Sequence, residues 1–227
     1  MSVLVYAESW SGVFRKSTYE VVSYAKKISN KLEKDLIAVS LGEVDHQELL
    51  KLSKYGANKV ISYPNINKGD NQIVADIITG IASSSSFLVF SNTYTAKMIA
   101  PRLSVKLKAG MVSNVVSLPD NFSPLNVKRK AFSSKAIELV TVNTPNIILS
   151  IAPNSFELIE SQSECVFETQ DISKKGDIYI EKEEVISGKI SISEAEIVVS
   201  AGRGLKGPEN WGMIEELAKE LGAATAC

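Results

Sequence analysis

The residues best suited to chemistry in this sequence lie in one glycine-rich stretch. Gly202, Gly204 and Gly207 have the G-x-G-x-x-G spacing that is typical of loops holding the pyrophosphate of a dinucleotide. The apolar residues 197–199 predict a strand over 196–200 before the loop, and the apolar periodicity after it predicts a helix over 208–222. Glycine lets the backbone turn sharply and approach a ligand, and a helix N-terminus presents N–H donors to an anion. The stretch therefore predicts an anion site between a strand and a helix.

Two cations distinguish this loop from the usual dinucleotide motif. Arg203 lies between the first two glycines, and Lys206 precedes the third. Cationic side chains in such a loop suit a phosphate, a pyrophosphate or the electron-rich end of a flavin. The glycine spacing alone is also compatible with a plain strand–turn–helix connection. For Arg203 the alternative is a salt bridge to the acidic segment before the loop, and for Lys206 it is simple solvation.

The sequence lacks the residues that most other kinds of catalytic site require. His46 is the single histidine, which excludes metal sites built on paired histidines. The two cysteines, Cys165 and Cys227, argue against a zinc site or a disulfide framework and fit a reducing compartment. The sequence contains no G-x-S-x-G, Walker A or C-x-x-C motif. We therefore expect no hydrolysis by a familiar site, no metal site and no self-contained set of catalytic residues.

The elements that must position the loop begin with an alternating pattern. Strand and helix alternate four times, and the strands are continuously apolar, which is typical of a parallel sheet covered by helices on both faces. After Gly110 the pattern changes to strands separated by turns, which we interpret as an antiparallel extension. The predicted helices are 16–32, 47–52, 71–82 and 93–107, the last delayed or kinked by Pro101; the predicted strands are 3–7, 36–41, 59–62, 87–90, 111–118, 127–131, 136–142 and 146–151.

An acidic segment separates this domain from the glycine loop. Nine acidic residues stand against three lysines between positions 157 and 184. We interpret about 154–192 as a polar connector that belongs to an N-terminal α/β domain over 1–192. Residues 193–227 then open a second domain with one strand and one helix.

Composition sets the remaining limits. The net charge of −1 gives no electrostatic reason to expect nucleic acid as a partner. No apolar run reaches the roughly 18 residues that a membrane-spanning helix needs, and the N-terminus has no export-signal pattern. We expect a cytoplasmic protein without membrane insertion.

A family resemblance makes the anion site specific. The stretch "VVSAGRGLKGPENWGMIEELAKELGAA" resembles the start of the flavin domain of the electron transfer flavoprotein alpha subunit. Four earlier stretches are similar to the same family: "VYAES…GVFRKSTYEVVSYAKKIS", "YGANKVI", "AKMIAPRLSVKLKAGMVSNV" and "VKRKAFSSKAIELV". The resemblance covers essentially the whole sequence, although 154–192 match only in acidic character.

The resemblance implies a function and a cofactor. It implies an electron carrier that uses FAD to pass electrons from dehydrogenases, such as acyl-CoA dehydrogenases of fatty acid β-oxidation, to a downstream acceptor. It implies a heterodimer with a beta subunit, which alone would bind AMP. Of this sequence's residues, Arg203 would contact FAD, and Gly202 and Gly204 would shape the loop.

The resemblance also implies a fold. The N-terminal domain would be similar to adenine-nucleotide-binding hydrolase folds, and 193–227 would be the first strand–helix unit of a Rossmann-like FAD domain. Relatives continue well beyond this point, so the sequence would be a C-terminally truncated alpha subunit, with most of the FAD domain missing.

Two further hypotheses come from other functional classes. One is a stand-alone nucleotide-binding or stress-type α/β module that binds ATP or AMP near residues 8–17. The loop in question, "ESWSGVFRKS", has one glycine and two bulky apolar residues, which makes it poor material for a phosphate cradle. The other is a non-redox docking protein whose N-terminal domain binds a beta-like partner.

Overall fold

The computed structural model describes residues 2–82, 85–172, 176, 178, 180–182, 192 and 195–227. The chain divides into two compact units, Met1–Ile180 and Glu181–Cys227. The predicted domain division after residue 192 stays a prediction, because residues 183–191 and 193–194 lie outside the described part. Within the described part, no helix combines the length and apolar character needed to cross a bilayer.

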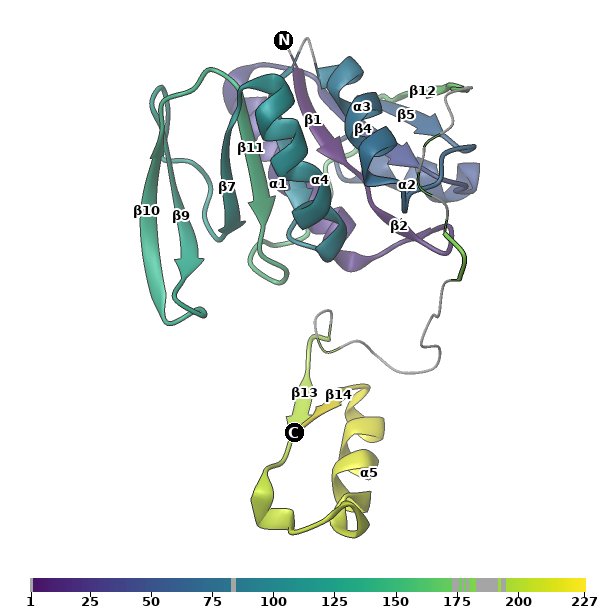
Figure 1. The fold of residues 1–227 in the computed structure, drawn as a ribbon, viewed down its shortest axis with the longest axis vertical. Helices are drawn as coiled ribbons and strands as arrows, with labels where there is room; N and C mark the ends of the chain where they lie inside the picture. The colour runs from purple at the N-terminus through teal and green to yellow at the C-terminus, as the bar shows by residue number, and fades with distance from the viewer. Residues whose placement is uncertain are drawn as a thin grey trace. The chain divides into compact units, whose positions relative to one another are not determined.

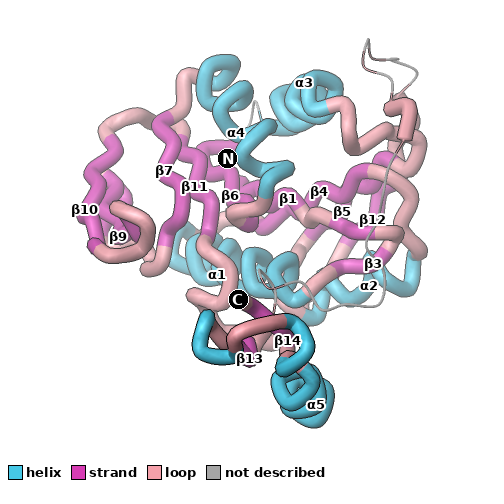
Figure 2. Tube along the Cα trace, turned by 60° about the horizontal axis from the view of Figure 1, so that its bottom comes forward, coloured by secondary structure: helices cyan, strands magenta, loops and turns pink. Residues whose placement is uncertain are grey.

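The first unit is built on one mixed sheet with helices on both faces. Its strands lie in the order β10-β9-β7-β11-β6-β1-β4-β5-β12. Helices α1 and α2 lie on one face of the sheet, and α3 and α4 lie on the other (Figure 2). Their buried apolar side chains belong to two core clusters, one on each face. The predicted α/β architecture is thus confirmed. The central strands are β1 (Ser2–Tyr6), β4 (Leu36–Leu41), β5 (Lys59–Tyr63) and β6 (Ser85–Ser91), and the helices are α1 (Lys16–Leu32), α2 (His46–Lys54), α3 (Asn71–Ala82) and α4 (Tyr94–Leu107).

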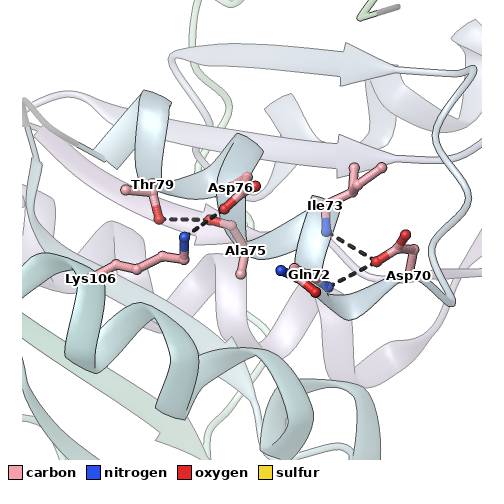
Figure 3. Close-up of polar contacts among 7 residues, drawn as sticks. All are labelled: Asp70, Gln72, Ile73, Ala75, Asp76, Thr79 and Lys106. Atoms are coloured by element: carbon pink, nitrogen blue, oxygen red, sulfur yellow. Dashed lines mark hydrogen bonds and ion pairs between the residues drawn. The ribbon is translucent and has the colours of Figure 1, made fainter. Parts of the chain in front are cut away.

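Two helices on the same face are fixed by side-chain contacts at their starts and between them (Figure 3). The Asp70 carboxylate accepts the N–H groups of Gln72 and Ile73 at 3.0 and 3.1 Å and so caps α3. Lys106 of α4 forms an ion pair with Asp76 of α3 at 2.6 Å. These contacts hold α3 and α4 side by side over the sheet.

Helix α4 tolerates a proline in its interior. Thr93 caps the helix by accepting the Ala96 N–H at 3.1 Å, and the helix runs from Tyr94 through Pro101. The helix therefore begins at Tyr94, before Pro101, and the proline does not delay its start.

The strands after Gly110 differ from the predicted antiparallel extension. β11 (Ile147–Ile151) inserts between β6 and β7 (Gly110–Val115) and runs parallel to both. β8 (Asn121–Phe122), β9 (Leu125–Ala131) and β10 (Ala136–Val142) pair antiparallel with their neighbours, and β7 meets β9 at one residue pair. Every residue of β11 is buried, as expected for a central strand covered on both faces.

The first part of the predicted connector also belongs to this sheet unit. The Glu20 carboxylate of α1 accepts the N–H groups of Asn154, Ser155 and Phe156 at 3.0, 2.7 and 2.6 Å. Farther along, β12 (Val166–Thr169) pairs parallel with β5 as an edge strand. The interpretation of the whole acidic segment as a connector is therefore wrong for these residues.

The second unit holds one more strand than predicted. It consists of β13 (Val198–Ser200), two short 3-10 turns, η1 (Arg203–Leu205) and η2 (Pro208–Asn210), helix α5 (Gly212–Leu221) and β14 (Ala224–Ala226). β14 pairs parallel with β13, with Val199 opposite Thr225. The predicted strand–helix unit is thus a small βαβ unit, in which the loop follows the first strand (Figure 1).

Candidate functional site

The glycine loop takes its path from its own backbone hydrogen bonds. The Ala201 N–H donates to the Ala226 carbonyl at 3.1 Å, which fixes the start of the loop at the end of β13. The carbonyls of Gly202 and Arg203 then accept the N–H groups of Leu205 and Lys206 at 3.1 and 3.0 Å. The loop is thus a tight turn at the carboxyl end of a parallel strand, the end at which open α/β sheets bind ligands.

The glycines of the loop leave its backbone open rather than allowing an unusual turn. A Cβ built on Gly202 or Gly204 would meet no atom within 4 Å. Gly202 has a φ of −114°, and neither glycine is in the left-handed region. The turn therefore does not require glycine at either position for a left-handed backbone. In contrast, Gly222 has a φ of 60° and ends α5, as predicted. Gly202 and Gly204 therefore provide space in which a ligand can approach the main chain.

The charges around the loop are mixed. The side chains of Arg203 and Lys206 are exposed, so both cations are available to an anion. The Glu209 carboxylate lies against Gly207, so that a Cβ built on Gly207 would clash with it. An anion bound here has to pair with the cations and avoid this carboxylate. The position of Glu209, two residues after Gly207, could have indicated from the sequence that a carboxylate borders the loop.

Helix α5 starts behind the loop without a side-chain cap. The side-chain amide of Asn210 donates to the Leu205 carbonyl at 2.8 Å and so joins the two 3-10 turns. The apolar side of α5 is only partly buried: Ala218 is buried, whereas Leu217 and Leu221 are about half exposed, at 50% and 47%. At the start of the helix, the N–H groups of Ile214 and Glu215 already donate to the Trp211 carbonyl at 2.9 and 3.2 Å, so these two donors are not available to a ligand.

The residues fit a bound pyrophosphate. Open glycine backbone and two exposed cations lie within one short βαβ unit, and this set suits the phosphates of a dinucleotide such as FAD. In the structure, Gly202, Arg203 and Gly204 lie at the turn that follows β13. Among the described residues, no group of histidine, cysteine and carboxylate side chains could hold a metal ion.

Residues 8–17, the region of the alternative nucleotide site, have a different geometry. They form a hairpin of β2 (Ser9–Trp10) and β3 (Val13–Phe14) that follows β1 in the chain, and the Lys68 ammonium donates to the Ser9 carbonyl at 2.8 Å. The Glu8 side chain is buried here and accepts the Thr93 hydroxyl at 2.6 Å. A buried carboxylate at this position opposes the binding of a phosphate.

A second carboxylate anchors the hairpin. Glu48 of α2 accepts the Phe14 N–H at 3.0 Å and the Tyr19 hydroxyl at 2.9 Å, and it pairs with Lys51. Burial acts to raise the pKa of Glu48, but the hydrogen bonds from Lys51, Phe14 and Tyr19 outweigh it and lower the pKa. Burial, followed by the hydrogen bond to Glu48, raises the pKa of the Tyr19 hydroxyl. Glu48 is therefore part of the fold rather than of a ligand site.

Comparisons with known families divide the chain in a similar way. Residues 3–184 match the electron transfer flavoprotein domain, and residues 191–227 match the electron transfer flavoprotein FAD-binding domain. The second match contains the whole βαβ unit described above.

Individual relatives cover nearly the whole chain. The electron transfer flavoprotein subunit alpha of Bacillus subtilis is 28% identical over 98% of this chain and 70% of its own length. The subunit alpha of Syntrophomonas wolfei is 27% identical over 97% of this chain and 71% of its own length. A lactate dehydrogenase (NAD(+),ferredoxin) subunit, LctC of Acetobacterium woodii, is 26% identical over 99% of this chain and 56% of its own length.

Proposed function

The chain belongs to the electron transfer flavoprotein family, on its alpha-subunit side, and from that premise we propose that it carries electrons through FAD as one subunit of a heterodimer. Proteins of this family are electron carriers rather than classical enzymes, although one relative, LctC, is a subunit of a lactate dehydrogenase. The observation that carries the proposal is the open, cationic loop at 202–206 within a segment that matches an FAD-binding domain.

In the proposed role, this chain's residues bind and tune the cofactor. Arg203 pairs with an anionic part of FAD, while Gly202 and Gly204 let the cofactor approach the main chain. Bound FAD supplies the redox chemistry, because its isoalloxazine ring accepts and donates electrons. A fixed cation close to the flavin favours the more negative redox state and so raises the reduction potential.

We propose that the partner is a beta subunit and that it covers part of residues 110–151. Exposed apolar side chains on the β9–β10 hairpin support this location: Phe132, Ile137 and Leu139 are 79%, 58% and 62% exposed. Apolar patches on a protein surface commonly mark interfaces.

The finer assignments rest on the family. We propose flavin dehydrogenases as electron donors, with acyl-CoA dehydrogenases of fatty acid β-oxidation as the first candidates, and AMP as a ligand of the beta subunit alone. The sparse use of cysteine supports a reducing, cytoplasmic location.

The proposal is tested by co-expressing the chain with the beta subunit encoded in the same genome. We expect the purified pair to co-migrate in gel filtration and to bind added FAD, measured by quenching of flavin fluorescence. The same pair should show no tight binding of ATP to the residue 8–17 region, measured with Glu8→Ala as the comparison. The result would favour the nucleotide-binding module instead if the pair bound ATP stoichiometrically and did not bind flavin. Glu8→Ala should then alter the ATP binding.

A further inference from the structure

Helix α4 has an apolar stripe on its solvent side. Tyr94, Met98 and Val105 are 86%, 52% and 80% exposed, and Pro101 between them is exposed as well. Their spacing is four, three and four residues, which places all four side chains along one face of the helix. This is the spacing of the a and d positions of a coiled-coil seam.

The stripe is not needed for the fold. The opposite side of α4 already buries Ala96, Ile99, Ala100 and Leu103 against the sheet. The helix is therefore apolar on two sides, of which one packs in the core and the other faces solvent. A surface helix of a globular protein ordinarily has charged or polar residues on its outer side.

Cations border the stripe. Lys97 and Arg102 occupy the positions next to the seam, which correspond to g and e of the heptad. Lys97 Nζ lies 5.0 Å from the ring centre of Tyr94, which keeps this cation beside the stripe. Lys106 instead reaches across to Asp76 of α3 (Figure 3). Helix α4 contains no acidic residue.

We propose that the outer face of α4 docks an amphipathic helix of a partner protein, one with apolar residues at coiled-coil spacing and carboxylates beside them. Residues at e and g set the choice of partner in such packings, so Lys97 and Arg102 select an acidic helix. A second copy of α4 would bring cations against cations, which disfavours self-pairing. This surface shares no residue with the flavin loop or with the β9–β10 hairpin, and the inference does not depend on the proposed function.

A designed peptide pair tests the proposal. The acidic probe is a labelled peptide of about 20 residues, long enough to form a helix, with Leu at a and d and Glu at e and g. The control peptide is identical except for Lys at e and g. We expect the acidic peptide to bind the intact chain at least about tenfold more tightly in fluorescence anisotropy, and the difference to shrink as salt is raised.

Substitutions locate the binding. Met98→Glu and Val105→Glu should each remove binding of the acidic peptide, while Ile137→Glu on the hairpin should leave it unchanged. The double variant Lys97→Glu/Arg102→Glu should reverse the preference, so that the basic peptide binds more tightly. Circular dichroism of each variant checks that the chain is folded.

Several outcomes would overturn the proposal. Equal binding of the two peptides, or no binding of either, would exclude a charge-selected helix. Self-association of the chain that Val105→Glu abolishes would identify a second copy as the occupant. Binding to vesicles of phosphatidylserine and phosphatidylcholine that Met98→Glu abolishes, without peptide binding, would assign the surface to a membrane.

Discussion

At the scale of single residues, Arg203 gives the flavin proposal its sharpest test. In the heterodimer, Arg203→Ala should weaken FAD binding or lower the flavin reduction potential, because a cation near the cofactor favours negative charge. A charge-assisted hydrogen bond contributes about 1.5–3 kcal/mol, so we expect a loss of affinity of roughly tenfold to hundredfold. Fluorescence titration and potentiometry measure both quantities.

Lys206 supplies the comparison for this experiment. It lies in the same loop and is equally exposed, so Lys206→Ala removes the same charge at a neighbouring position. If both variants kept the affinity and the potential of the parent pair, Arg203 would have only a structural role.

Glu48 makes the stability of the first unit depend on pH. Its pKa is lowered from the ordinary value of 4.5, so its stabilising contacts are fully present above that value and are lost as the pH falls through the folded pKa. We expect urea midpoints of the parent chain to fall below about pH 4.5 more steeply than those of Glu48→Gln. The exposed Glu43→Gln serves as the control and should follow the parent; identical slopes for all three chains would remove Glu48 from this role.

At the scale of elements, one carboxylate ties a late segment to the first helix. Glu20→Ala leaves the three N–H donors of 154–156 without their acceptor. These hydrogen bonds are partly buried, so each loss costs less than the about 1–3 kcal/mol of a fully buried unpaired donor. We expect a loss of at least about 2 kcal/mol in the free energy of unfolding, and faster hydrogen exchange of these amides. Lys27→Ala, on the exposed side of α1, should change neither measurement by a comparable amount.

Helices and central strands were largely predictable from the sequence, since their apolar spacing alone defines them. Helices 16–32 and 71–82 have the predicted ends, because apolar periodicity and flanking polar residues coincide there. The orientation of β11 was not predictable, since its apolar run fits a buried strand of either direction. β12 was missed because only four residues, with an acidic Glu168, form it, and its place depends on pairing with β5.

The loop proposed as the candidate site could be located from the sequence, but its geometry could not be predicted. The spacing of Gly202, Arg203 and Gly204 identified the loop, and the structure places all three at one turn. The open backbone at the two glycines, the position of Glu209 and the strand β14 depend on the folded path of the chain. Three residues, Ala-Thr-Ala, are too few for a strand pattern to be recognised.

At the scale of the whole molecule, the two units differ in the size of the sheet on which each is built. The second unit has a two-stranded sheet and one helix, and such a small sheet is marginally stable in water. We expect the 227-residue chain, purified without a partner, to lose added FAD during gel filtration, measured by absorbance of the eluted peak. Stoichiometric flavin in that peak would make the loop at 202–207 a self-sufficient site.

Limited proteolysis tests where the first unit ends. A polar connector over 157–192 would be open to cleavage throughout, but residues 161, 163 and 166 donate backbone hydrogen bonds to residues 53–58. We therefore expect few early cuts between 157 and 172, identified by mass spectrometry of the fragments. Early cleavage within β12 would show that this edge strand is not held in solution.

The central place of β11 has a consequence for synthesis of the chain. Ile147 pairs with Phe87, 60 positions earlier (147 minus 87), so the middle of the sheet closes through contacts distant in sequence. Such contacts form slowly, whereas the β9–β10 hairpin needs only neighbouring residues. During translation, a nascent chain that has left the ribosome only as far as β10 has β6 and β7 as two apolar, unpaired edges. Chaperone binding is most valuable in that interval, and it ends when β11 emerges and fills the gap.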